Sequence, residues 1–251
     1  MGRFWRMIRN IVFPPRCACC RELLPATQES YGAGSCLCKK CHGLWNRAKE
    51  ENCPECLCPS HKCLCAPDTR AFKKSTLPKL LTYMPNINNT QNKIIYALKK
   101  TNDKRICEFV ASELSLSMGR FFVDRGILPD ECIYTYVPRR RRSVSEFGFD
   151  QGLRLSQEIC RLFEGQFEHL FVRRGGKEQK QLDKNSRAAN IDRSLGVSRS
   201  AAEIVKGRKV VIVDDLVTTG ATLDRAMRLI KKLGAKEVYV ACVARTAQKK
   251  H

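Results

Sequence analysis

Short apolar segments alternate with longer segments of helical period over most of the chain after residue 76. The short segments predict strands at residues 77–83, 133–137, 170–172, 209–213 and 238–243. Apolar residues that recur every three or four positions predict helices at residues 94–98, 106–116, 147–163 and 221–233, the last ending at Gly234. Strands that alternate with helices in this way indicate βαβ units, so we expect an α/β fold with a parallel sheet flanked by helices.

The first 65 residues differ because cysteine, rather than apolar periodicity, dominates them. Eleven of the fifteen cysteines lie between Cys17 and Cys65. The other four are scattered among apolar residues, where we expect them to be small core residues: Cys107, Cys132, Cys160 and Cys242. We therefore predict a cysteine-rich module at residues 17–66 and an α/β domain at residues 67–251.

The N-terminal segment places arginines between apolar residues, which predicts a short amphipathic helix at residues 1–16. It lacks the continuous apolar core and the small-residue cleavage site of a signal peptide. No stretch approaches the roughly 20 apolar residues that a membrane span requires. We therefore expect a cytoplasmic protein without a transmembrane segment, in which closely spaced cysteines bind metal rather than form disulfides.

Two pairs of the form Cys-x2-Cys predict a first zinc site. Cys17 and Cys20 form one pair, and Cys38 and Cys41 form the other after seventeen intervening residues. Each pair places two thiolates on a tight turn, and two such turns supply the four sulfur ligands of a structural zinc ion. The nearby thiols of Cys19 and Cys36 could compete for this site.

A second zinc site is predicted further along the module, where Cys53 and Cys56 form the clearest pair. The segment that follows offers more ligands than one zinc ion needs. We choose Cys63 and Cys65, with His61 or Cys58 as alternative fourth ligands. The module is too small and too poor in apolar residues to fold on a core alone, so structural zinc would hold it together.

The charge of the chain predicts an anionic partner. It carries 46 basic and 25 acidic residues, which gives a formal charge of +21. Nucleic acid, a phosphorylated small molecule and an anionic membrane surface all fit this charge.

The most informative segment combines two carboxylates with a hydroxyl-rich turn. Asp214 and Asp215 follow four apolar residues, and a Thr-Thr-Gly-Ala-Thr turn then opens a helix. Carboxylates can accept hydrogen bonds from vicinal ribose hydroxyls, while N–H groups at a helix N-terminus bind a phosphate. Gly220 lets the backbone approach a ligand closely. We therefore predict a ribose 5-phosphate site formed by Asp214, Asp215, Val217, Thr218, Thr219, Gly220, Ala221 and Thr222.

The same segment has two other interpretations. One is an ordinary strand, turn and N-capped helix with solvated aspartates. The other is a Walker B strand, but the chain lacks the G-x-x-x-x-G-K-[ST] motif that would accompany it.

Residues 210–222 resemble the phosphoribosyl pyrophosphate (PRPP) signature of type I phosphoribosyltransferases, and nearly the whole chain resembles the ComF family. The further matching motifs are residues 13–17, Ala97-Leu98-Lys99, the "VP…RR" stretch at residues 137–140, the "GFNQ" stretch at residues 148–151, and Gln179, Leu182, Arg187 and Asn190. The chain departs from the family pattern at Asp150, where asparagine is usual, at the crowded Cys63-x-Cys65 ending, and at the glycines before Gln179.

The resemblance implies a double zinc ribbon joined to a phosphoribosyltransferase domain that binds PRPP with Mg²⁺. It implies that Pro138, Arg139 and Arg140 contact the pyrophosphate, and that Arg187 acts in a flexible loop that closes over the substrate. The catalytic residues would then be Asp214, Asp215 and Arg187.

The ComF resemblance further implies a role in DNA uptake and natural transformation, with single-stranded DNA as a partner and a DNA-uptake helicase as another. The charge and the basic residues at 139–142 and 173–174 favour nucleic-acid binding. Phe147 and Phe149 could add stacking platforms, although two phenylalanines at this spacing are more often core residues. The alternative is an active PRPP-dependent transferase with an unknown acceptor and no role in DNA handling.

Overall fold

The computed structural model describes residues 14–24, 36–72, 78–83, 90–139, 148–173 and 194–246. Most of the predicted N-terminal helix lies outside the described residues. So do Arg140, Phe147, Gln179, Arg187 and Asn190, so their predicted roles stay predictions.

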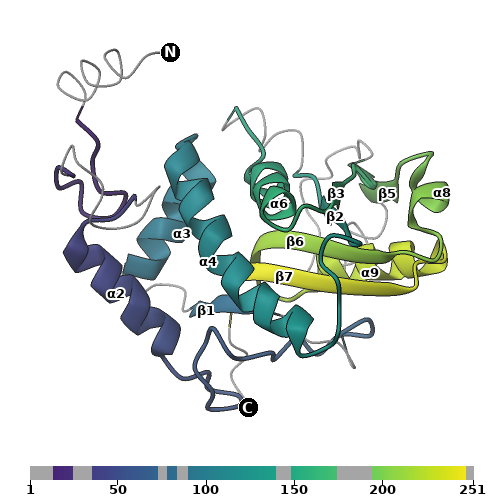
Figure 1. Cartoon of the computed structure of the whole chain (residues 1–251), viewed down its shortest axis with the longest axis horizontal. Helices are drawn as coiled ribbons and strands as arrows, with labels where there is room; N and C mark the ends of the chain where they lie inside the picture. Colours follow the sequence, from purple (N-terminus) through teal and green to yellow (C-terminus); the bar gives the residue numbers. More distant parts are fainter. Residues whose placement is uncertain are drawn as a thin grey trace, which may run out of the picture.

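Five parallel strands form the central sheet in the order β1-β7-β6-β2-β3 (Figure 1). Their bounds are Lys79–Tyr83 (β1), Ile133–Tyr136 (β2), Gln166–Phe167 (β3), Lys209–Val217 (β6) and Glu237–Thr246 (β7). A separate antiparallel pair consists of β4 (Phe171–Arg173) and β5 (Leu195–Val197). The parallel sheet predicted from the sequence is confirmed.

The apolar run of β6 exists because both faces of the sheet are covered. Val211 and Val213 pack into one core cluster, whereas Val210 and Ile212 pack into a second cluster on the opposite face. Successive side chains of a strand point to opposite faces, so a strand with two covered faces is apolar at nearly every position.

Helices cover the two faces. The first cluster contains residues of α3 (Thr90–Lys100), α4 (Lys104–Val123) and α6 (Gln151–Leu162), and the second contains residues of α8 (Ala201–Val205) and α9 (Ala221–Lys232). The side chain of Asp103 accepts a hydrogen bond from the N–H of Arg105 and caps α4. Asp150 caps α6 in the same way, because it accepts from the N–H groups of Gly152 and Leu153.

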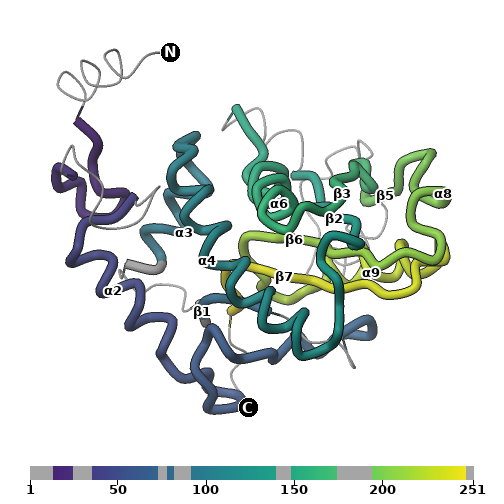
Figure 2. Tube along the Cα trace, viewed as in Figure 1, coloured from purple at the N-terminus to yellow at the C-terminus, as the bar shows by residue number. Residues whose placement is uncertain are grey.

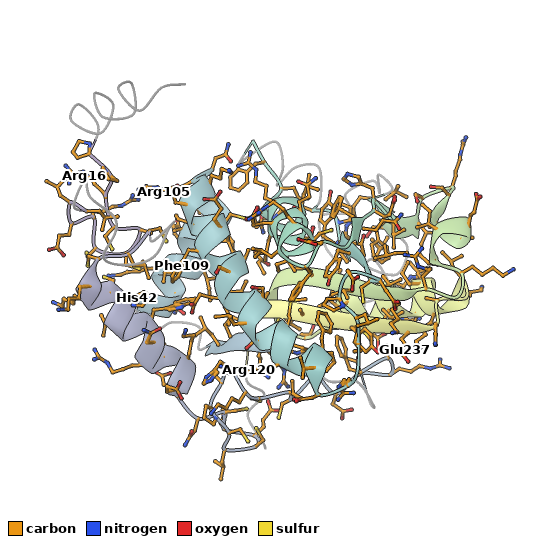
Figure 3. All side chains as sticks on the ribbon, viewed as in Figure 1. Arg16, His42, Arg105, Phe109, Arg120 and Glu237 are labelled. Atoms are coloured by element: carbon orange, nitrogen blue, oxygen red, sulfur yellow. The ribbon has the colours of Figure 1, made fainter. Side chains whose placement is uncertain are left out.

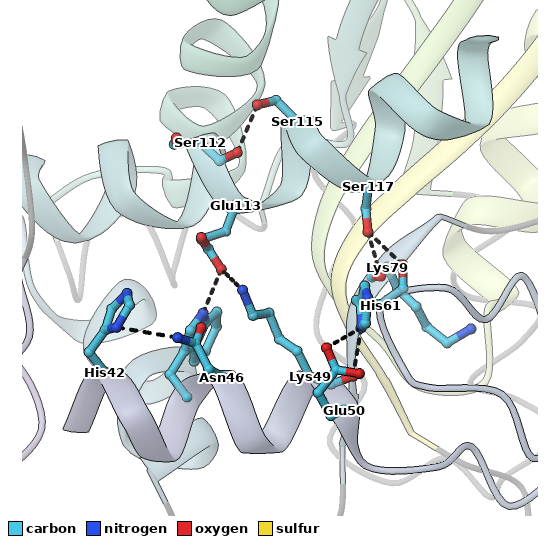
Figure 4. A network of polar contacts seen from close by, with 11 residues as sticks. His42, Asn46, Lys49, Glu50, His61, Lys79, Ser112, Glu113, Ser115 and Ser117 are labelled. Atoms are coloured by element: carbon cyan, nitrogen blue, oxygen red, sulfur yellow. Dashed lines mark hydrogen bonds and ion pairs between the residues drawn. The ribbon is translucent and has the colours of Figure 1, made fainter. Parts of the chain in front are cut away.

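The cysteine-rich segment joins the first cluster through α2 (Lys39–Glu50), a helix that the sequence analysis did not predict. Trp45 is fully buried, and its Nε1 donates to Glu113 Oε2 on α4 at 2.9 Å. Lys49 pairs with the same carboxylate, so α2 is fixed to α4 by a buried aromatic residue and an ion pair (Figure 4). His42 of α2 also meets Phe109 of α4, with ring centroids 6.2 Å apart (Figure 3).

The four cysteines outside the module are all buried, as expected: Cys107, Cys132, Cys160 and Cys242. Three of them belong to the first core cluster and Cys242 to the second. Cys242 lies on β7 and pairs in register with Asp214 on β6. This small side chain therefore packs in the core directly beside the carboxylates that the sequence singled out.

Candidate functional site

Asp214 and Asp215 lie within β6 rather than after its end. The strand was predicted to stop at residue 213, but it continues to Val217 because β7 runs alongside it and supplies pairing partners up to Arg245. The turn to α9 therefore consists of residues 218–220 only. Asp214 is half-buried, and Asp215 is buried with 6% of its surface exposed.

Three residues from other elements converge on the carboxylate of Asp215. Gln151, the first residue of α6, donates from Nε2 to Asp215 Oδ2 at 2.7 Å. Lys99 Nζ on α3 and Arg139 Nη2 after β2 each lie 3.8 Å from the same oxygen. Sequence reasoning gave no site role to Lys99 or Gln151, although both occur in motifs that resemble the ComF family.

Asp214 has a pKa well above its usual value, because burial disfavours its charged form and the neighbouring carboxylate of Asp215 repels it. A divalent cation or a pair of donating hydroxyls would relieve this repulsion. Gln151 also has a buried Oε1 that accepts no hydrogen bond from any described residue. The site therefore combines charged acceptors with an amide oxygen that can receive a hydrogen bond from a ligand.

The segment after β2 borders these carboxylates. The N–H of Arg139 donates to Asp150 Oδ2 at 3.0 Å, and Arg173 Nε donates to the carbonyl of Pro138 at 2.9 Å. Asp150, the residue that departs from the ComF pattern, thus both caps α6 and holds Arg139. The structure brings Arg139 to the carboxylate of Asp215, and the predicted contact of Pro138 and Arg139 with pyrophosphate stays a prediction.

The turn after β6 combines two exposed hydroxyl side chains with a left-handed glycine at the start of α9. Thr218 and Thr219 are exposed, whereas Gly220 is buried and has a left-handed φ of 75°. Ala221 and Thr222 begin α9, whose first N–H groups lack helical partners and favour negative charge. The N–H of Ala221 lies 3.4 Å from Thr219 Oγ1, which orders the turn.

The four cysteines of the first predicted zinc site lie together. The Sγ atoms of Cys17, Cys20, Cys38 and Cys41 are all within 4.8 Å of one another. A tetrahedral zinc ion with Zn–S bonds of about 2.3 Å separates its sulfur ligands by about 3.8 Å. The group therefore fits a metal ion of that size.

The second group consists of Cys53, Cys56, Cys63 and Cys65, whose Sγ atoms also lie within 4.8 Å of one another. The alternative ligands are outside it. Cys58 is exposed, and His61 Nδ1 donates to the carbonyl of Lys49 at 2.9 Å.

The additional thiols near the first group are also outside it. Burial raises the pKa of both Cys19 and Cys36 to about 12. Burial also raises the pKa of Cys41 inside the group, so the positions of the sulfur atoms, and not their pKa values, leave Cys19 and Cys36 outside it.

Comparisons with known proteins agree with this geometry. A model of the phosphoribosyl transferase domain matches residues 150–251. Competence protein ComFC of Streptococcus pneumoniae is 26% identical over 212 residues, which cover 84% of this chain and 88% of that protein. DNA utilization protein YhgH of Escherichia coli K12 is 28% identical over 240 residues, which cover 94% of this chain and 99% of that protein.

A shorter match links the chain to Competence protein F of Haemophilus influenzae, which is 32% identical over 106 residues, covering 39% of this chain and 43% of that protein. The sheet, the matched domain and the two cysteine groups define a protein of the type I phosphoribosyltransferase fold with an N-terminal module compatible with two zinc ribbons. Among proteins of this fold, the chain is similar over most of its length to Competence protein ComFC and to DNA utilization protein YhgH. In the part of the chain that the structure describes, no helix has the length and apolar character needed to cross a bilayer.

Proposed function

We propose that the chain binds a ribose 5-phosphate ligand, PRPP in the first instance, at Asp214–Thr222, with Mg²⁺ bound through the pyrophosphate. The observation that carries this proposal is the convergence of Lys99, Arg139 and Gln151 on the carboxylate of Asp215, next to the turn that opens α9. Cations beside paired carboxylates suit a ligand that presents both hydroxyls and phosphates.

Each group has a distinct role in this proposal. Asp214 and Asp215 accept hydrogen bonds from the ribose hydroxyls, and Thr218–Thr222 bind the 5-phosphate through N–H groups and hydroxyls. Arg139 and Lys99 stabilise the negative charge of the pyrophosphate, and Arg140 and Arg187 contribute to the same task. Mg²⁺ is held mainly by ligand oxygens and water, because it gives up its coordinated water reluctantly.

The two cysteine groups bind structural Zn²⁺ in this proposal. Four thiolates close the coordination sphere of each ion, so neither metal has an open position for catalysis. Metal analysis of the purified protein should find two zinc ions per chain, and one ion would mean that one group is not a site.

Titration calorimetry with Mg²⁺ and PRPP tests the ligand site. We expect saturable binding that disappears in the double variant Asp214→Asn/Asp215→Asn. Asp124→Asn/Asp130→Asn is the matched control, because both of these carboxylates are exposed and lie in the α4–β2 connection. Unchanged binding in the first variant would refute the assignment, and release of pyrophosphate on addition of a nucleobase would favour the transferase alternative.

A second activity, binding of single-stranded DNA in the cytoplasm during DNA uptake, is favoured by one face of α3. Lys93, Tyr96 and Lys100 recur at intervals of three and four residues, all three are exposed, and the helix contains no acidic residue. Tyr96 is 63% exposed, and Lys100 Nζ lies 5.6 Å from its ring centroid. Exposed aromatic rings that stack on bases, beside lysines that contact phosphates, are typical of surfaces that bind single strands.

This surface replaces the aromatic platform considered from the sequence. Phe149 is 8% exposed and stacks under Arg154 instead, so it belongs to the core. The relatives named for competence and DNA utilization support a partner of this kind, and a DNA-uptake helicase is a further partner that we propose.

Fluorescence anisotropy with an oligothymidine at several salt concentrations tests DNA binding. Each lost phosphate contact should reduce the slope of log affinity against log salt by about 0.7, so Lys93→Gln/Lys100→Gln should reduce it by about 1.4. Tyr96→Ala should weaken binding by about 1–3 kcal/mol. Lys231→Gln/Lys232→Gln, at the exposed end of α9, is the charge-matched control. Equal slopes in the two double variants would exclude the α3 face.

A further inference from the structure

Residues 66–72, which we call the connecting segment, run from the second cysteine group to the turn after β6. Figure 2 follows this part of the chain, in blue, from the end of α2. Pro67 is buried against Gly220, and a Cβ on that glycine would lie only 2.8 Å from Pro67 Cγ. Phe72 is 2% exposed and belongs to the core cluster beneath α9. The segment therefore packs directly on the proposed phosphate-binding turn.

Asp224, in the first turn of α9, fixes the connecting segment by hydrogen bonds. Its Oδ1 accepts from Thr69 Oγ1 at 2.8 Å and from the N–H of Ala71 at 2.6 Å. Its Oδ2 accepts from Arg228 Nε at 2.8 Å. Asp224 is only 7% exposed, so these bonds form in a site largely shielded from water. Because Asp224 lies four residues after Gly220, its contacts hold the segment and the turn in one arrangement.

The other end of the connecting segment begins at the second cysteine group. Cys65 is two residues before Pro67, and its carbonyl accepts a hydrogen bond from the buried ammonium of Lys79 at 3.0 Å. Glu55, between the first two cysteines of this group, pairs with Arg245 at 2.9 Å. The group is thus bonded to β1 and β7, and only Ala66 separates Cys65 from the proline that contacts the turn.

We propose that the second cysteine group and the phosphate-binding turn are thermodynamically coupled through the connecting segment. Metal bound by Cys53, Cys56, Cys63 and Cys65 fixes the start of the segment, and Pro67 and Asp224 then hold the turn in its ligand-binding shape. Thr69 and Asp224 are positioning residues in this arrangement, since they act through the turn and not on the ligand. This inference rests on the proposed binding of PRPP.

Coupling of this kind is reciprocal. If metal in the second group favours PRPP, PRPP must favour metal in that group by the same factor, and typical coupling corresponds to a 5- to 150-fold change in affinity. The first cysteine group lies at the N-terminal end of α2, whereas the second group and the connecting segment follow the C-terminal end of that helix. The first group therefore serves as an internal control within the same molecule.

The test measures zinc release to a chelating dye from the full-length protein, with and without saturating Mg²⁺ and PRPP. We expect the ligand to increase retention of one zinc ion at least fivefold and to leave the other unchanged. Cys56→Ser identifies the retained ion as that of the second group, because its loss should abolish the ligand-sensitive phase. The same variant should bind PRPP at least fivefold more weakly while it keeps the first zinc ion.

A matched pair of variants separates positioning from general stability. Thr69→Val has nearly the same shape as threonine but lacks the hydroxyl that donates to Asp224, whereas Thr69→Ser keeps it. We expect the valine variant to lose the effect of PRPP on zinc retention and the serine variant to keep it, with two zinc ions bound in both.

The outcomes distinguish this inference from the proposal on which it rests. If the protein with two zinc ions does not bind PRPP, both are overturned. If it binds PRPP but releases both ions at unchanged rates, or if Thr69→Val and Thr69→Ser behave alike, only the coupling is overturned.

Discussion

Replacement of Lys79 by methionine tests how a buried ammonium supports the second cysteine group. Lys79 lies on β1 with 1% of its surface exposed. Its Nζ lies 3.1 Å from Cys63 Sγ, 3.2 Å from the carbonyl of Cys63 and 3.0 Å from the carbonyl of Cys65. Methionine has a similar length but no donor, so the variant leaves these three acceptors without the ammonium while it keeps most of the buried volume.

The expected effect has two parts. A zinc ion with four thiolates carries a formal charge of −2, which a neighbouring cation offsets, and loss of such an outer partner lowers metal affinity about 10–100-fold. This corresponds to about 1.4–2.8 kcal/mol. Removal of one partner of a buried charged contact lowers the free energy of unfolding by about 3–5 kcal/mol. For a chain of this size, such a loss lowers Tm by roughly 6–20 °C.

Chelator competition and thermal unfolding measure the two parts. We expect Lys79→Met to lose one zinc ion at about 10–100-fold lower chelator strength than the original protein and to retain the other. Lys62→Met is the control, because Lys62 is exposed and adjacent to Cys63. If both variants release zinc at the same chelator strength, the ammonium does not support the metal site and the reasoning fails.

Three further predictions concern stability. Although burial raises the pKa of Asp103, the hydrogen bonds and charge of Arg105 outweigh it and lower that pKa. Asp103→Ala should therefore lower the free energy of unfolding by about 0.5–2 kcal/mol at neutral pH. Urea titrations should show this difference vanishing as pH falls through the lowered pKa. Burial and the adjacent carboxylate raise the pKa of Asp214, so Asp214→Asn should raise Tm in the absence of ligand at neutral pH. The gain in Tm should shrink as pH falls below the raised pKa and vanish once pH falls below the ordinary pKa of an aspartate, where the folded and unfolded chains are both protonated. Gly220→Ala should lower the free energy of unfolding by about 1–3 kcal/mol, because the new methyl group would meet a buried proline ring. Gly119→Ala should instead raise it by about 0.5–1 kcal/mol in the same denaturation assay, because Gly119 lies inside α4 with open space around it.

The elements that could be predicted from the sequence are those with a strong local pattern. β6 and β7 are apolar on both faces, and α9 shows a helical period that ends near Gly234. α2 was missed although Cys41, Trp45 and Ala48 are buried at helical spacing, because Cys41 was assigned to a metal site and the remaining pattern is short. β3 has only two residues and carries no period that a sequence could reveal.

The candidate site likewise contains residues that a sequence pattern reveals and contacts that only the folded structure reveals. The aspartates and the turn are contiguous, so their chemistry is visible in thirteen residues of sequence. The contact of Gln151 with Asp215 joins positions 64 residues apart, and it exists only because α6 begins at the edge of the sheet where β6 ends. The contacts of Thr69 with Asp224 and of Lys79 with Cys63 depend on tertiary packing in the same way.

The ion pair between Glu55 and Arg245 has a consequence for biosynthesis. The two residues are 190 positions apart, and β7, which carries Arg245, lies between β1 and β6 in the sheet. A ribosome therefore completes all the cysteines of the N-terminal module long before it makes the strand that covers them. Contacts of such long range slow folding, because a large loop must close before they form. In the proposed zinc-bound form, early capture of the ion would shield the nascent thiols from oxidation during this interval. We therefore expect the yield of native protein to fall when zinc is scarce at the time of translation.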